Sequence, residues 1–239
     1  MNRIQNPGRV AGLWYLLLVL VAPFRLLYIP GALFVRGDAT ATANNIAAHQ
    51  LQFRLGILSE LLCGVILIFL VLALYRLFKG VSQYQAVLMV IVGGVIPATI
   101  DFLNPLNDAA ALMLIRGEDF LSAFDKPQRD ALAMLFLRLH HQLVVAAEIL
   151  WGLWLFPLAI LTYRSGFLPR FIGVWLAVNG VAYVAISFTG LLWPQYETMV
   201  SNIAFPALLG EIALMLWLLI KGAKPQVRND ATSSLAAQV

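Results

Sequence analysis

Ionisable side chains inside long apolar runs are the residues of this sequence best placed to do chemistry. The acidic members of this group are Glu60, Asp101, Glu148 and Glu211. The basic members are Arg25, Arg138, His140 and His141. A charged group in the hydrocarbon of a bilayer costs several kcal/mol unless it is paired, protonated or facing water. We therefore expect the chemistry of this protein to lie within the membrane.

Depth along the helices indicates a pocket that opens to the outer face. At a rise of about 1.5 Å per residue, Glu60 lies about 10 Å and His141 about 13 Å below the outer ends of their runs. We expect Glu148 and Glu211 to form the floor of this pocket. The walls are expected to be Arg25, Glu60, Asp101 and His141.

Spacing on single helices predicts which side chains share a face. Arg138, His141 and Glu148 follow a three-and-four pattern and share one face, which we expect to point toward Glu60 and Glu211. The side chain of the neighbouring histidine, His140, points about 100° away. A second stripe, on which small residues let another helix approach the acid closely, consists of Gly56, Glu60 and Gly64.

Three functions are compatible with these residues. In the first, Glu60, Glu211 and His141 exchange protons while the pocket binds or transports a small molecule or ion. In the second, His141 with Glu60 and Glu211 binds a divalent metal such as Zn²⁺ or Mn²⁺ and activates water against a lipid-like substrate. In the third, the protein is a non-catalytic accessory or signalling protein and its charges only hold helices together. This third interpretation, in which the charges are structural, is strongest for the residues near the membrane interface, which are Arg54, Asp101 and Asp108.

Composition excludes a soluble protein and argues against nucleic acid. The chain has 239 residues, 61% of them hydrophobic and only 12% charged, whereas soluble domains are about 25% charged. The net charge of +4 comes from basic residues that sit singly at the ends of apolar runs. We therefore expect the lipid bilayer as partner, together with an unknown small molecule or ion, and a homo-oligomer stays open. No cofactor is evident beyond the metal of the second function.

Six apolar runs are long enough to span a bilayer, which takes about 20 residues. They predict an all-α, multi-pass bundle within one domain, residues 1–224, followed by a disordered polar tail, residues 225–239. A short surface helix is expected at Ala39–His49, and an interfacial helix or cap at Asn107–Asp130. The six runs are Arg9–Pro30, Phe53–Phe78, Gln83–Leu106, Leu132–Tyr163, Phe171–Trp193 and Met199–Ile220.

Loop charges predict the orientation, because cytoplasmic loops carry an excess of Lys and Arg. With the N-terminus inside, the cytoplasmic segments hold Arg3, Arg9, Arg76, Lys79, Arg164, Arg170, Lys221, Lys224 and Arg228. The opposite loops hold Arg36, Arg116, Lys126 and Arg129. This imbalance predicts that both termini are cytoplasmic.

Several separated strings resemble domain-of-unknown-function family 4386. They are Tyr163–Val174, Gly8–Tyr15, Phe53–Ile57 and Gly210–Gly222. The resemblance covers about Arg9 to Gly222 and implies a small bacterial six-helix protein of the cytoplasmic membrane. The matching positions with chemical potential are Arg54, Glu60, His141, Ser165, Arg170 and Glu211. Glu60 stands where the family commonly carries Asp, and no activity follows from the resemblance.

Overall fold

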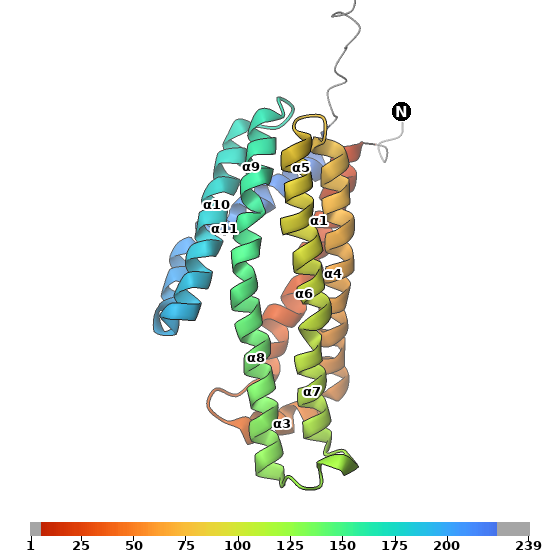
Figure 1. Ribbon diagram of the computed structural model, residues 1–239, viewed down its shortest axis with the longest axis vertical. Helices are drawn as coiled ribbons and strands as arrows, with labels where there is room; N and C mark the ends of the chain where they lie inside the picture. The colour runs from red at the N-terminus through yellow and green to blue at the C-terminus, as the bar shows by residue number, and fades with distance from the viewer. Residues whose placement is uncertain (1–5, 224–239) are drawn as a thin grey trace, which may run out of the picture.

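A computed structural model describes residues 6–223, and this part of the chain is helical throughout, without strands (Figure 1). It contains six helices long and apolar enough to cross a membrane, as predicted. The tail expected at residues 225–239 lies outside the described residues. The six spans are Pro7–Leu33, Gln50–Phe78, Gln83–Arg116, Lys126–Arg164, Arg170–Leu192 and Pro194–Ile220.

Several of these spans consist of more than one helical segment. The first is α1 (Pro7–Pro23), the π-helical turn η2 (Phe24–Tyr28) and α2 (Ile29–Leu33). The second is α4 (Gln50–Phe78), preceded by the short helix α3 (Ala39–Ala48). The third is α5 (Gln83–Val90), the π-helical turn η3 (Ile91–Val95), α6 (Ile96–Leu103) and α7 (Pro105–Arg116).

The second half of the chain has the same character. A 3-10 turn, η4 (Asp119–Leu121), leads into α8 (Lys126–Leu153) and α9 (Leu155–Arg164), which form the fourth span. The last two spans are α10 (Arg170–Leu192) and the pair η5 (Pro194–Tyr196) and α11 (Glu197–Ile220). Prolines and π turns interrupt the regular hydrogen bonding of helices, and such turns are frequent at functional sites.

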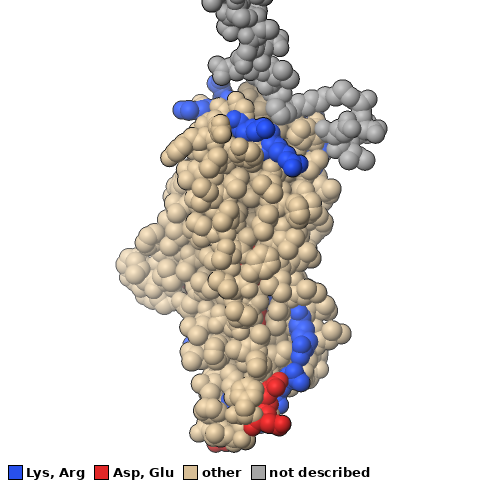
Figure 2. Space-filling view, turned by 45° about the vertical axis from the view of Figure 1, so that its right-hand side comes forward, with Lys and Arg blue, Asp and Glu red and all other residues tan. Residues whose placement is uncertain are grey.

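The spans differ in length, so the bundle has a long and a short part. The 23 residues of α10 give a helix of about 35 Å, whereas the 39 residues of the fourth span, Lys126–Arg164, extend about 58 Å. The lower ends of α4, α7 and α8, together with α3, therefore continue well past the turn between α10 and α11 (Figure 1). In Figure 2, charged side chains gather toward the two ends, with a broad uncharged band between them.

The two described chain ends meet at one end of the bundle. The Gly8 amide donates to the Ala223 carbonyl at 3.0 Å, and the Ala223 amide donates to Asn6 Oδ1 at 3.0 Å. A β-carbon on Gly12 would lie 2.8 Å from the amide nitrogen of Leu219, so α1 and α11 pack closely there. From this point the two helices diverge toward the other end of the bundle (Figure 1).

The connections at the opposite end are more helical than expected. The predicted surface helix is present as α3, capped by Asp38, and it buries Ile46 completely. The stretch expected as an interfacial helix or cap, 107–130, is helical at both of its ends, because α7 continues to Arg116 and α8 begins at Lys126. Gly117, with φ of 67°, ends α7 in the left-handed conformation, and a capping box formed by Asp125 and Gln128 starts α8.

Candidate functional site

A buried ion pair between Arg25 and Asp108 joins the first and third spans. Arg25 Nε and Nη2 donate to the two oxygens of Asp108, each at 2.7 Å. Arg25 is 3% exposed and Asp108 is 0% exposed. Gly56 leaves room for this arginine, since a β-carbon there would lie 3.3 Å from Arg25 Cδ. This bidentate arrangement is the strongest form of an Arg–carboxylate contact and lets both charges be buried.

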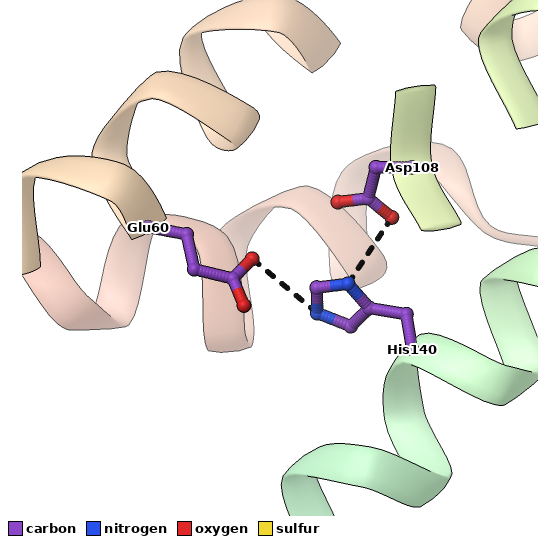
Figure 3. Close-up of side chains that lie close together, drawn as sticks. All are labelled: Glu60, Asp108 and His140. Atoms are coloured by element: carbon purple, nitrogen blue, oxygen red, sulfur yellow. Dashed lines mark ion pairs between the residues drawn. The ribbon is translucent and has the colours of Figure 1, made fainter. Parts of the chain in front are cut away.

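His140 lies between two carboxylates from different spans (Figure 3). Its Nδ1 is 3.4 Å from Asp108 Oδ1, and its Nε2 is 3.6 Å from Glu60 Oε2. Within residues 6–223, neither ring nitrogen of His140 makes a hydrogen bond, and Glu60 Oε2 accepts none. Buried polar atoms are nearly always satisfied, so this imidazole and this carboxylate oxygen have capacity for a proton or a ligand.

Asn104 holds the same cluster from the junction of α6 and α7. Its Nδ2 donates to Glu60 Oε1 at 3.1 Å and to the backbone carbonyl of His140 at 3.4 Å. Asn104 is 1% exposed. Gly64, one turn after Glu60, lets α6 approach α4, since a β-carbon there would lie 3.1 Å from Asp101 Cβ. The expected small-residue stripe on α4 therefore brings two other spans close to its acid.

A second polar cluster surrounds Glu211 on α11. The hydroxyl of Tyr15 on α1 donates to Glu211 Oε1, and Asn179 Nδ2 on α10 donates to Glu211 Oε2 at 3.4 Å. Tyr15 lies about 12 Å from the start of the first span and Arg25 about 27 Å from it. The Glu211 cluster is therefore about 12 Å from the end of the bundle where the described chain ends meet, and the Glu60 cluster lies about 15 Å further along the axis.

One cavity of about 240 Å³ connects the two clusters. Each of the six spans contributes to its wall. Tyr15 and Glu211 line one end, and Arg25, Glu60 and Asp101 line the other. The six spans together thus enclose a mostly apolar space with acids at both ends.

The structure separates the predicted residues into two groups. Arg25, Glu60, Asp101 and Glu211 line the common cavity. The other three, Arg138, His141 and Glu148, do not line it within the described part of the chain.

The predicted inward face of the fourth span is wrong. Arg138 is exposed, and the side chain of His141 is 59% exposed, with its Nε2 3.7 Å from Glu197 Oε1. Glu148 is half-buried, and its Oε2 lacks a hydrogen-bond partner among residues 6–223. The physical reason is a rotation of one residue: the face that packs inward carries His140, which is 2% exposed.

Two central residues were not expected from the sequence. Asp108 was taken for an interfacial residue, but α7 continues the third span and places it in the bundle interior. His140 was expected to point away from the site. Its position could have been found from the small side chains of Ala133 and Ala147, which lie seven residues to either side of it and are buried on the same helix. Small residues mark the faces through which membrane helices pack.

The Glu60 cluster is a candidate metal-binding group. Glu60, Asp108 and His140 offer ligand atoms that all lie within 4.8 Å of one another. One imidazole and two carboxylates are a ligand set that suits Zn²⁺ or Mn²⁺. The unsatisfied atoms of His140 and Glu60 fit this reading, whereas the adjacent Arg25 guanidinium opposes a second cation. His141, expected as the nitrogen ligand, lies outside this group.

The fold and the site define an α-helical membrane protein, with six apolar spans around an acid-lined cavity. A family model described as "Domain of unknown function (DUF4386)" matches residues 10–222. The chain belongs to this family, as its sequence strings predicted. No curated protein and no solved structure matches the chain.

Proposed function

We propose that the protein binds a small molecule or ion in the cavity between its spans and moves it across the membrane with proton coupling. The observation that carries this proposal is the single cavity lined by Glu60 and Asp101 at one end and by Glu211 at the other. Ionisable residues in membrane spans are rare and commonly mark ion or proton pathways. Glu60, Glu211 and His140 are the groups that exchange protons.

The contacts of these groups support a change of protonation. Glu211 already accepts from Tyr15 and Asn179 when it is charged. When it is protonated, it can donate from one oxygen and still accept on the other. His140 has no competing hydrogen bond on either ring nitrogen within residues 6–223, so it can take up a proton between Glu60 and Asp108. Both clusters therefore have geometry for two protonation states.

Thermal melting of the purified protein in detergent tests this proposal. A panel of small cations, anions, zwitterions and neutral compounds is screened at two pH values, with wild-type protein and Glu211→Gln. We expect at least one compound to raise the melting temperature of the wild type in a pH-dependent way, and this effect to be lost in the variant. If each stabilising compound acts equally at both pH values and on both proteins, the proposal is wrong.

A second candidate is a metal-dependent membrane enzyme acting on a lipid-like substrate. The grouping of Glu60, Asp108 and His140 favours it, because a bound metal could activate water there. Metal content of the purified protein decides between the candidates. Stoichiometric Zn²⁺ or Mn²⁺ that is absent from His140→Ala but retained by His141→Ala would put the enzyme first. A metal-free wild type would eliminate it.

We also propose that the protein lies in the bacterial cytoplasmic membrane with both termini in the cytoplasm. The two described chain ends lie together, and basic residues at that end support a cytoplasmic position. These residues are Arg9, Arg76, Lys79, Arg164, Arg170 and Lys221. A fluorescent-protein fusion after Ala223 should be bright, and an alkaline phosphatase fusion at the same place should be inactive. The opposite pair of results would reverse the orientation.

A further inference from the structure

Aromatic side chains surround Glu211 in the cavity. Tyr15 and Trp154 lie with ring centroids 6.3 Å apart, and Trp151 and Tyr183 form an edge-to-face pair at 5.9 Å. The four rings and Glu211 all line the central cavity. Aromatic faces attract cations, and a carboxylate neutralises them. This end of the cavity thus has the chemistry of a site for an organic cation.

The charges along the cavity agree with this chemistry. Within residues 6–223, Arg25 is the one basic side chain of the lining, and its charge is matched by the bidentate contact with Asp108. Glu60, Asp101 and Glu211 line the same space. When they ionise, the cavity carries excess negative charge, which excludes anions and attracts cations.

The arrangement of α1 and α11 indicates how a ligand enters. The two helices are in contact near Gly12 and at Tyr15 and Glu211, and beyond this point they diverge (Figure 1). Leu26, on the η2 side of the cavity, is 37% exposed, while Leu208 lines it from α11. Both apolar side chains line the cavity, so a path into it between these two helices would be lined by hydrocarbon and would suit a lipophilic ligand.

We propose that the cavity binds a lipophilic organic cation, which enters from the bilayer between α1 and α11 and is held by Glu211 and the surrounding aromatic rings. This inference rests on the proposed function and names its ligand class. Protonated Glu211 cannot neutralise a cation, so binding weakens as the pH falls. The titratable groups that face Glu211 are Tyr15 on α1 and Tyr183 on α10, and Glu148 on α8 faces Tyr183. Arg25, Glu60 and Asp101 are the charged groups at the other end of the cavity.

Equilibrium binding of two probes of equal shape, one cationic and one neutral, tests the inference on the wild-type protein in detergent. Benzyltrimethylammonium is expected to bind, and its neutral carbon isostere, neopentylbenzene, is expected to bind at least tenfold more weakly. The affinity for benzyltrimethylammonium should fall at acidic pH, and at least tenfold in Glu211→Gln. Trp151→Leu should weaken it severalfold, while Trp193→Leu, at an exposed position outside the cavity lining, should leave it unchanged.

The outcomes separate this inference from the proposed function. Equal binding of both probes, or an unchanged affinity in Glu211→Gln, would overturn the organic-cation site. If benzyltrimethylammonium does not bind but an anion or neutral compound of the thermal panel shows pH- and Glu211-dependent stabilisation, the inference is wrong and the proposed function stands. If the cationic probe does not bind and no compound of the thermal panel shows pH- and Glu211-dependent stabilisation, both the inference and the proposed function are wrong.

Discussion

Neutralising Asp108 is the perturbation whose consequence can be worked out most fully. Asp108 is fully buried and accepts both of its hydrogen bonds from Arg25, each at 2.7 Å. In Asp108→Asn, one oxygen is replaced by an amide that cannot accept from the guanidinium. The charge of Arg25, which is 3% exposed, then loses its bidentate partner and keeps only the longer contact with Glu60 Oε2, at 3.9 Å.

The magnitude follows from the burial of the pair. Removing one partner of a buried ion pair costs about 3–5 kcal/mol, because the remaining charge is uncompensated. For a chain of this size, about 1 kcal/mol corresponds to a shift of about 2–4 °C in melting temperature. We therefore expect Asp108→Asn to melt about 6–20 °C below the wild type.

Thermal melting in detergent, followed by circular dichroism, measures this shift. The matched control is Asp130→Asn, because Asp130 pairs with Lys126 at 2.7 Å but that lysine side chain is 55% exposed. An ion pair with an exposed partner contributes about 0–1 kcal/mol. The double variant Arg25→Met with Asp108→Leu should recover most of the loss, since apolar side chains often replace buried pairs without penalty. A shift for Asp108→Asn no larger than that of the control would refute this reasoning.

Two further variants test the packing around the cavity. Glu60→Gln should destabilise by less than about 1 kcal/mol, because its amide oxygen can still accept from Asn104 and Arg25, 3.9 Å from Glu60 Oε2, keeps its two shorter contacts with Asp108. A melting shift as large as that of Asp108→Asn would contradict this. Gly12→Ala should cost about 1–3 kcal/mol, since its β-carbon would lie 2.8 Å from the backbone nitrogen of Leu219. Gly31→Ala, with open space around the added carbon, serves as its control and should melt no lower than the wild type. Equal shifts for the two glycine variants would show that α1 and α11 are not closely packed.

The helices of this protein could be predicted from its sequence because a membrane span leaves a strong signal. About 20 consecutive apolar residues have few alternative explanations, and each of the six runs corresponds to a span. The ends of the spans are harder to predict from the sequence than their existence. Asn107–Arg116 is polar enough to read as a loop, but it continues the third span, because Gly117 and not Leu106 provides the stop.

The face of each helix was harder to predict than its existence. In a membrane helix the side that meets lipid is as apolar as the side that packs inward, so hydropathy does not distinguish them. His140 and His141 illustrate this, because a difference of one residue turns the side chain by about 100°. Arg25 and Glu60 were placed in the cavity from depth alone, and their partner Asp108 required the actual path of α7.

The measurement that tests the central claim most directly is proton exchange on ligand binding. The strongest stabiliser from the thermal panel is mixed with protein in weakly buffered detergent solution, and a pH-indicator dye reports the protons exchanged per ligand bound. The account predicts a non-zero number for the wild type and a smaller number for Glu211→Gln. Binding to the wild type without any proton exchange would contradict it.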